Sequence, residues 1–417
     1  LFRHPRFRIN LVRSETVAAM VRTGLARLLS ERLDAIRGAR VGLMCHGASV
    51  DSNLRYAFDL LLAAGVDVRF ILAPEHGIFG EIPYMKRVDD FRLQPADIPV
   101  VSLYKDTADH LRPPAGLLES IDVLICDVQD VGSRYYTYVA TMAMLMEACG
   151  GTSVRFIVLD RPNPIGLSRV EGNICIPEIR SFVSYIGLPS RHALTAAEIA
   201  SYYRQTAGLD LDLELVACDG LDRQMTWCDT GLPFVPPSPN IPDAATALVY
   251  TGMCLLEGTN LSEGRGTASP FLFAGAPWIA DPWRFADLLA AADLPGVLFR
   301  PVRFTPRFDK HADVSCGGVH LVVSDPKRFN SLLTGMTIVA TAATTWPDRF
   351  ALRTDAYEFI RDIPALDLLL GDRHSADALL QGVPPRDVLA AMESGLNDWT
   401  TTVAPHLLYT ASLGGAR

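Results

Sequence analysis

Three apolar runs in the first 165 residues each end in a polar loop containing glycine or proline. The runs cover residues 66–73, 121–126 and 154–159, and the loops carry Glu75, Asp127 and Asp160 near their starts. Short apolar runs bounded by turn-forming residues predict buried strands. In an open parallel α/β sheet, ligands bind outside the carboxyl ends of the strands. The pattern therefore predicts one crevice lined by acidic side chains.

Strands and helices alternate through this region. Further strands are predicted at 41–45 and 100–104, and helices at 54–62 and 137–148. Thr195 and Glu198 form a capping box that begins another helix. This alternation predicts an α/β fold, with a Rossmann-like, doubly wound, mostly parallel sheet and helices on both faces.

A chain of 417 residues is too long for one ordinary core. We expect three parts: a helical N-terminal lead-in at 1–37, a Rossmann-like catalytic domain at 38–236, and a smaller C-terminal α/β domain at 237–417 that closes the cleft. The best candidate linker is 232–242, because its five prolines continue neither a helix nor an inner strand. In the second domain we expect helix starts at Asp281–Pro282 and Asp325–Pro326, a strand at 319–323 and a final helix at 386–399.

Composition narrows the functional classes. The chain is 49% hydrophobic and 20% charged, as folded proteins are, and its net charge of −9 disfavours a nucleic-acid partner. No apolar run reaches the roughly 18 residues of a membrane span. No signal peptide is visible, and the chain begins at Leu1. We expect a secreted or periplasmic protein if a leader has been removed, and a cytoplasmic one otherwise.

Several common catalytic signatures are missing. The eight cysteines contain no C-x-x-C pair, and there is no dinucleotide fingerprint after a strand, no phosphate loop, no H-E-x-x-H and no G-x-S-x-G. We therefore expect neither a metal nor a cofactor. The carboxylates, arginines, tyrosines and amides that remain suit sugar chemistry.

Glu75 is the first catalytic candidate. It follows a strand and a proline, and Gly77 and Gly80 allow its loop to bend tightly. A partly desolvated carboxyl group at a strand mouth could protonate a leaving oxygen. The alternative is a structural glutamate that caps a helix or pairs with Arg87.

The other loops offer weaker candidates. Asp127 could act in the crevice, whereas Asp130 is expected to cap the following helix. Arg161 could hold an anionic group, and a structural Asp–Arg pair is an equal alternative. A second polar cluster at 255–267 lies just beyond the linker, where it could close the crevice from the second domain.

These clusters together resemble the NamZ-type exo-β-N-acetylmuramidases. The matching stretches are 74–80, 127–138, 159–166, 170–172, 191–195, 237–240, 254–267 and 275–278, and the resemblance spans roughly 38 to 410. It implies a Rossmann-like domain joined to a smaller C-terminal domain, with the site in the cleft between them. It also implies release of N-acetylmuramic acid from the non-reducing end of peptidoglycan fragments, with Glu75 as a catalytic residue. The chain departs from the family pattern at 81–85, which puts subsite details and the exact substrate in doubt.

Glycosidic cleavage usually uses two carboxyl groups. We expect Glu75 to be the acid. Its partner could be Glu171, Asp127 or Glu263, or the 2-acetamido group of the substrate could act as nucleophile. The residues expected to bind substrate are His76, Arg134, Tyr136, Asp160, Arg161, Asn163, His192, Asn240, Glu257, Asn260 and Arg265.

Among these residues, Arg134, Arg161 and Arg265 are candidates to hold the lactyl carboxylate of muramic acid, with a structural ion pair as the alternative for each. His76 and His192 are candidates for hydrogen bonds to sugar hydroxyls, although a structural role is the better expectation for His192. The competing functions are an esterase or deacetylase acting on cell-wall fragments and a non-catalytic sugar-binding protein.

Overall fold

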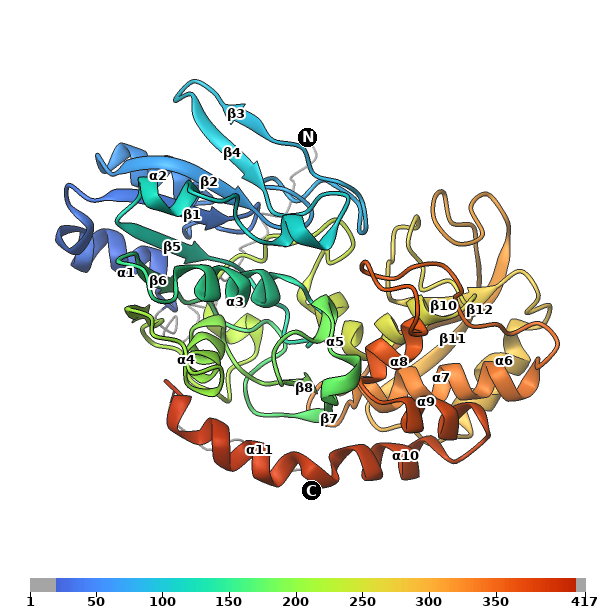
Figure 1. Cartoon of the computed structure of the whole chain (residues 1–417). Coiled ribbons are helices and arrows are strands. Elements are labelled where there is room, and N and C mark those ends of the chain that lie inside the picture. Colours follow the sequence, from blue (N-terminus) through green and yellow to red (C-terminus); the bar gives the residue numbers. More distant parts are fainter. Residues whose placement is uncertain (1–19, 410–417) are drawn as a thin grey trace, which may run out of the picture.

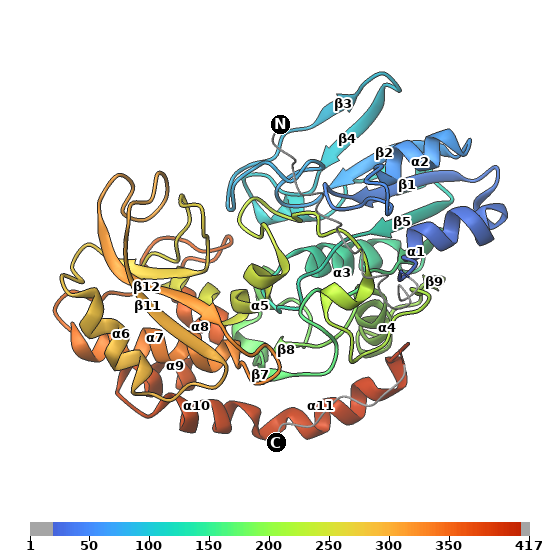
Figure 2. The ribbon, with the colours of Figure 1, turned by 180° about the vertical axis from the view of Figure 1, so that it is seen from behind.

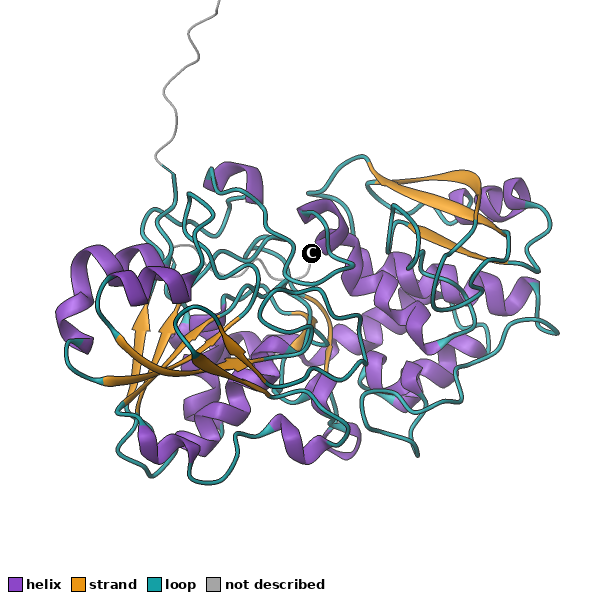
Figure 3. Cartoon of the chain, turned by 90° about the horizontal axis from the view of Figure 1, so that it is seen from above, coloured by secondary structure: helices purple, strands orange, loops and turns teal. Residues whose placement is uncertain are grey.

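The computed structural model describes residues 20–409, and its larger part is a seven-stranded sheet with helices on both faces (Figures 1 and 3). The strand order is β3-β4-β2-β1-β5-β6-β9, and every neighbouring pair is parallel except β3 with β4. The strands are β1 (Arg40–Cys45), β2 (Asp67–Ala73), β3 (Phe91–Leu93), β4 (Ile98–Ser102), β5 (Val123–Asp127), β6 (Arg155–Leu159) and β9 (Leu213–Val216). The predicted α/β class with a mostly parallel sheet is confirmed.

The helices of this part are α1 (Gly24–Arg27), α2 (Ala57–Ala63), α3 (Tyr138–Cys149) and α4 (Ala196–Thr206). Successive side chains of a strand point to opposite faces, so an inner strand with helices on both sides is apolar throughout. In β1, Leu43 packs in the core that contains α1 and α2, whereas Met44 packs in the core that contains α3 and α4. The predicted capping box begins α4: the Glu198 amide donates to the Thr195 hydroxyl, and the Thr195 amide donates to the Glu198 carboxylate.

The smaller part contains a three-stranded antiparallel sheet of order β10-β12-β11, packed beside a group of helices (Figure 1). Its strands are β10 (Phe273–Ala276), β11 (Val297–Phe304) and β12 (Cys316–Val323). The helices are α5 (Ala244–Met253), α6 (Pro282–Ala290), α7 (Ser331–Thr345), α8 (Ala365–Leu370), α9 (Arg373–Leu380), α10 (Pro385–Met392) and α11 (Leu396–Val403). A short antiparallel pair, β7 (Glu171–Ile174) and β8 (Pro189–Arg191), lies near the junction of the two parts.

Helix starts in this part were predicted with mixed success. Asp281 caps α6, because its carboxylate accepts from the amides of Trp283 and Arg284 and Pro282 occupies the first helical position. The predicted start at Asp325 is wrong: its carboxylate closes only a turn, and α7 begins after its own cap, Asn330. The predicted final helix is divided at 393–395 into α10 and α11.

The two parts are joined by more than a linker. One continuous apolar core extends from α3 and α4 to α5, α7 and α9. The α10–α11 segment runs beneath the molecule and returns to the larger part (Figures 1 and 2). There the Leu408 amide donates to Glu198, and the Tyr409 hydroxyl donates to Asp160.

Part of the predicted lead-in, residues 1–19, lies outside the described residues. The remainder packs on the large sheet, with Leu25 and Leu28 fully buried in the core that contains α2. Within 20–409, no helix has the length and apolar character needed to cross a membrane.

Candidate active site

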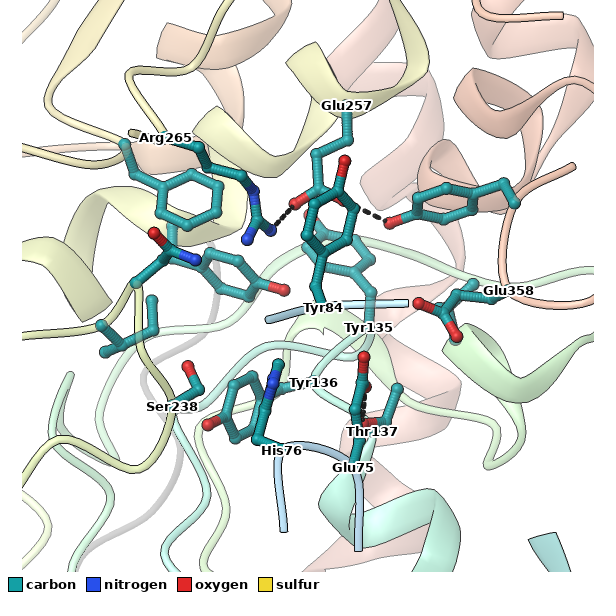
Figure 4. Close-up of a pocket in the computed structure, with 16 residues that line it drawn as sticks. Glu75, His76, Tyr84, Tyr135, Tyr136, Thr137, Ser238, Glu257, Arg265 and Glu358 are labelled. Carbon is teal, nitrogen blue, oxygen red and sulfur yellow. Dashed lines mark hydrogen bonds and ion pairs between the residues drawn. The ribbon is translucent and has the colours of Figure 1, made fainter. Parts of the chain in front are cut away.

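A small pocket lies where the carboxyl ends of β2 and β5 meet the smaller part of the chain (Figure 4). Its cavity volume is about 30 Å³. One water needs roughly 10–15 Å³ by this measure, so the pocket as it stands has room for about two waters and not for a sugar ring. The side chains that carry the argument below are Glu75, His76, Tyr84, Tyr136, Thr137, Asn240, Glu257, Arg265, Tyr357 and Glu358.

Glu75 enters the pocket from the loop that follows β2. Its side chain is buried, one carboxylate oxygen accepts from the Thr137 hydroxyl at 2.7 Å, and the other accepts from the Met85 amide at 3.1 Å. The next residue, His76, has a left-handed backbone (φ 71°) that turns the loop sharply. Its ring bonds the Ile82 carbonyl at 2.7 Å, and burial lowers the pKa of His76. The neutral imidazole thus positions the loop and adds no charge to the pocket.

Glu358 enters the same pocket from the smaller part and points toward the space above Glu75 (Figure 4). Its carboxylate accepts from the Tyr104 hydroxyl at 2.8 Å. Burial, followed by the negative charge of Glu75, raises the pKa of Glu358 well above its ordinary value. Two carboxyl groups therefore share one buried pocket, and Glu358 is the member whose surroundings retain a proton.

A buried charge cluster closes the opposite wall. Arg265 donates to Glu257 at 2.5 Å and lies 3.1 Å from Glu263, while Lys310 lies 2.7 Å from Glu263. Tyr357 donates its hydroxyl to the second Glu257 oxygen at 2.9 Å. Burial raises the pKa of Glu263, but the charges of Lys310 and Arg265 outweigh this effect and leave that pKa below its ordinary value. Glu257 and Arg265 face the pocket, whereas Glu263 supports Arg265 from behind.

Residues 77–90, called the strap below, lie between β2 and β3 of the larger part and contact the smaller part beside this pocket. Tyr84 lies over the Arg265 guanidinium, 3.8 Å from it, and donates its hydroxyl to Asp309 at 3.0 Å. Gly77 and Gly80 both have left-handed backbones, which begin the strap with two sharp turns.

The structure brings six of the predicted site residues to this pocket: Glu75, His76, Tyr136, Asn240, Glu257 and Arg265. The Pro-rich segment expected to be a linker forms part of the wall, because Asn240 belongs to it. The shared pocket expected for the 75, 127 and 160 loops does not form, since the latter two loops direct their charged side chains elsewhere.

Asp127 and Arg161 instead form a buried two-pronged ion pair, with distances of 2.6 and 2.8 Å. This pair lies beside the point between β1 and β5 where the strand order reverses, the usual binding crevice of a doubly wound sheet. Asp160 accepts from the Ala197 amide and the Tyr409 hydroxyl, and burial raises its pKa to about 7. These three side chains hold the sheet, α4 and the C-terminal segment together.

Glu171 is also held by structural contacts. It pairs with Arg191 at 2.8 Å and Arg169 at 3.3 Å and accepts from the Leu332 amide at the start of α7. The structure therefore does not place Glu171, Asp127 or Glu263 opposite Glu75 in this pocket.

The remaining predicted residues bond to the backbone or to each other outside the pocket. Arg134 donates to the carbonyls of Asn173 and Leu369, and Asn163 donates to that of Leu194. His192 lies 3.2 Å from Asp130, whose carboxylate closes a turn at Gly132 and does not cap α3. Asn260 joins the backbone at Arg349 and Ala351.

Sequence reasoning missed Glu358, Tyr84, Tyr104 and Tyr357. Glu358 follows no predicted strand or glycine-rich loop. Its one local signal is that a lone acidic residue lies between aromatic residues, in Tyr357-Glu358-Phe359. No group of three or more metal-ligating side chains occurs in the described part of the chain.

Comparison with known proteins places this arrangement in a family. The N-terminal and C-terminal models of the exo-β-N-acetylmuramidase NamZ match residues 41–245 and 248–409. The peptidoglycan β-N-acetylmuramidase NamZ of Bacillus subtilis (strain 168) is 36% identical over 390 residues, covering 93% of this chain and 91% of the relative.

Two solved structures of DUF1343 family proteins from Bacteroides fragilis NCTC 9343 are also similar. One has a TM-score of 0.85 and 29% identity and covers 95% of this chain and 100% of its own. The other has a TM-score of 0.72 and 25% identity and covers 94% and 99%. The chain therefore belongs to the NamZ family of exo-β-N-acetylmuramidases.

Proposed function

We propose that this protein is an exo-acting glycoside hydrolase that releases N-acetylmuramic acid from the non-reducing end of peptidoglycan fragments. One observation carries the proposal: Glu75 and Glu358 share one pocket between the two parts of a chain that matches the muramidase family along nearly all its length.

The environments of the two carboxyl groups suggest their roles. Burial keeps the pKa of Glu358 high, so Glu358 carries the proton and donates it to the glycosidic oxygen as the bond from that oxygen to the anomeric carbon breaks. Glu75, whose two oxygens both accept hydrogen bonds, supplies the carboxylate. This reverses the expectation that Glu75 is the acid but retains Glu75 as a catalytic residue.

The carboxylate of Glu75 then has three possible routes to complete the reaction. It acts directly at the anomeric carbon or as a base toward water, or it orients the substrate's 2-acetamido group for attack. In each route the water supplies hydroxide to the muramic acid and a proton to the enzyme pair. The distance between the two carboxyl groups when the sugar is bound distinguishes retention, at roughly 5–5.5 Å, from inversion, at roughly 6.5–9.5 Å.

Arg265 is the cation placed to recognise the lactyl carboxylate of muramic acid. Its guanidinium faces the pocket between Tyr84 and Glu257 (Figure 4). Glu257 and Glu263 fix the plane of the guanidinium, and a fixed planar fork suits carboxylate recognition. In contrast, Arg134 and Arg161 are occupied outside the pocket.

Substrate entry requires movement of the strap. A cavity of about 30 Å³ does not hold a pyranose, and Tyr84 lies over the pocket with one hydrogen bond to the smaller part. We therefore place the opening at residues 77–90, with Gly77 and Gly80 as its hinges. Closure over the terminal sugar would then exclude water from the two carboxyl groups.

The test replaces each carboxyl group by its amide. We expect Glu75→Gln and Glu358→Gln each to lower kcat for a chromogenic N-acetylmuramide by about 10²–10⁴-fold, the usual contribution of an acid or base. The matched control is Glu119→Gln, which changes an exposed glutamate outside the pocket. Activity of either site variant within about tenfold of wild type contradicts its role. Ester or acetamide cleavage without glycosidic cleavage points to the esterase class, and unchanged bound sugar points to a binding protein.

A further inference from the structure

A second cavity, of about 300 Å³, adjoins the catalytic pocket at Glu358. Its lining is mainly apolar and includes Leu111, Met144, Phe182 and Phe359, with Arg180 and Tyr185 among its polar members. Glu358 lines both this cavity and the catalytic pocket. The two spaces are therefore adjacent, and one carboxyl group lies at their boundary.

Glu358 lies in a tight turn with an unusual conformation. Tyr357 and Ile360 exchange two backbone hydrogen bonds of 2.9 Å, and the two residues between them, Glu358 and Phe359, both have left-handed backbones (φ 45° and 69°). Glycine and asparagine normally occupy such positions, and other residues adopt them at a cost of roughly 1–3 kcal/mol each. Strain of this kind persists where the surroundings enforce it, commonly at functional sites.

Packing enforces the turn from both sides. The Phe359 ring lies 5.4 Å from the Tyr104 ring and 6.4 Å from the Phe182 ring, and Tyr104 also bonds Glu358. The result is that Tyr357 faces the catalytic pocket, Phe359 faces the second cavity, and Glu358 reaches both.

The two arginines that line the second cavity differ in their hydrogen-bond partners. Arg112 is held by Glu147 at 2.6 Å and by the Tyr185 hydroxyl at 3.0 Å. Arg180 is exposed, and its guanidinium makes no hydrogen bond or ion pair with another described residue. An apolar cavity with aromatic walls and one free donor group is typical of a small-molecule binding site.

We propose that this second cavity binds the sugar on the leaving-group side of the bond that is cut, an inference that rests on the proposed function. If the terminal sugar occupies the catalytic pocket and its neighbour occupies the second cavity, the oxygen that joins them lies at the boundary beside Glu358. The apolar face of the neighbouring sugar packs on Phe182 and Phe359, and its hydroxyl or acetamido oxygens accept from Arg180. Binding energy from this non-reacting sugar would then accelerate cleavage.

The test compares two substrates of the full-length enzyme: a chromogenic N-acetylmuramide, whose aryl group offers Arg180 no hydroxyl or acetamido group, and the disaccharide N-acetylmuramyl-N-acetylglucosamine. Arg180→Ala should lower kcat/KM for the disaccharide about tenfold relative to kcat/KM for the muramide. The reason is that the variant loses one hydrogen bond from a charged donor to the leaving sugar. A bulky substitution at the exposed lining residue Ala108, Ala108→Trp, should lower disaccharide cleavage by blocking the cavity. Arg284→Ala, at an exposed residue of α6, is the matched control.

The possible results separate this inference from the proposed function. A wild-type enzyme that cleaves neither substrate contradicts both. Suppose that the wild-type enzyme cleaves both substrates, that Arg180→Ala leaves the substrate ratio unchanged, and that Ala108→Trp cleaves the disaccharide normally. These results together overturn only the proposal that the second cavity binds the leaving sugar.

Discussion

At the scale of single residues, the surroundings of Glu358 determine whether its carboxyl group is protonated and can act as an acid. A glutamate in water is ionised at neutral pH, but burial and the nearby Glu75 charge raise the pKa of Glu358. The Tyr104 hydroxyl acts in the opposite direction, because it donates to the ionised form. Since a general acid must be protonated, activity should fall as pH rises through the pKa of Glu358.

Tyr104→Phe tests this account by removing one hydroxyl. The loss of its hydrogen bond destabilises the ionised form of Glu358, so the alkaline limb of the kcat profile should move to higher pH by about one unit. The measurement is kcat against pH on the chromogenic muramide. Tyr202→Phe is the control, since that hydroxyl donates to the Gly187 carbonyl outside the pocket. A limb that stays in place, or moves to lower pH, would mean that Glu358 does not supply the proton.

At the scale of elements, the strap at 77–90 links the two parts of the chain above the reacting groups. It supplies the Met85 amide to Glu75, and it places the Tyr84 ring between Arg265 and solvent. One segment therefore both donates a hydrogen bond to the catalytic carboxylate and helps to exclude water from the pocket.

Tyr84→Ala should open the pocket permanently. We expect kcat/KM for the muramide to fall about tenfold, because water then competes with the sugar for the polar groups. The alkaline limb should also move to lower pH, since hydration reduces the burial that raises the pKa of Glu358. Tyr84→Phe keeps the ring over Arg265 and loses only the bond to Asp309, so it should show a smaller effect. Equal losses in the two variants would contradict the covering role of the ring.

The elements near the large sheet were predictable because their signals are local. Apolar runs gave β1, β2, β5 and β6, and a capping box gave the start of α4. Glu75 was found because it directly follows one of these strands. Glu358 was not, because its position depends on a left-handed turn far along the chain whose conformation is enforced by Tyr104 and Phe182 from the other part. Such a constraint is tertiary and leaves little trace in the local sequence.

At the scale of the whole molecule, most of the buried acidic residues maintain the fold. Asp127, Asp160, Glu171 and Glu198 each accept from arginines, amides or hydroxyls that join separate segments. From the sequence alone, Asp127 and Asp160 look equivalent to Glu75, since each of the three lies at or directly after the end of a predicted strand. The distinction lies in which partners the folded chain provides.

Asp127→Asn should separate stability from catalysis. It leaves Arg161 buried without its counter-charge, so the free energy of unfolding should fall by about 3–5 kcal/mol. The folded fraction should retain kcat near the wild-type value, because Asp127 does not line the pocket. Denaturant unfolding together with kinetics at low temperature gives both quantities, and Asp59→Asn on the exposed face of α2 is the control. A stable but inactive Asp127→Asn enzyme would show that Asp127 has a catalytic role.

The most direct test of the central claim is a crystal structure of the Glu75→Gln variant with N-acetylmuramyl-N-acetylglucosamine bound. We predict that the muramic acid ring lies in the pocket beneath a displaced strap, with residue 75 near the anomeric carbon and a Glu358 oxygen about 2.6–3.2 Å from the bridging oxygen. A disaccharide bound elsewhere, or one whose bridging oxygen lies beyond the reach of Glu358, would contradict the assignment of this carboxyl pair.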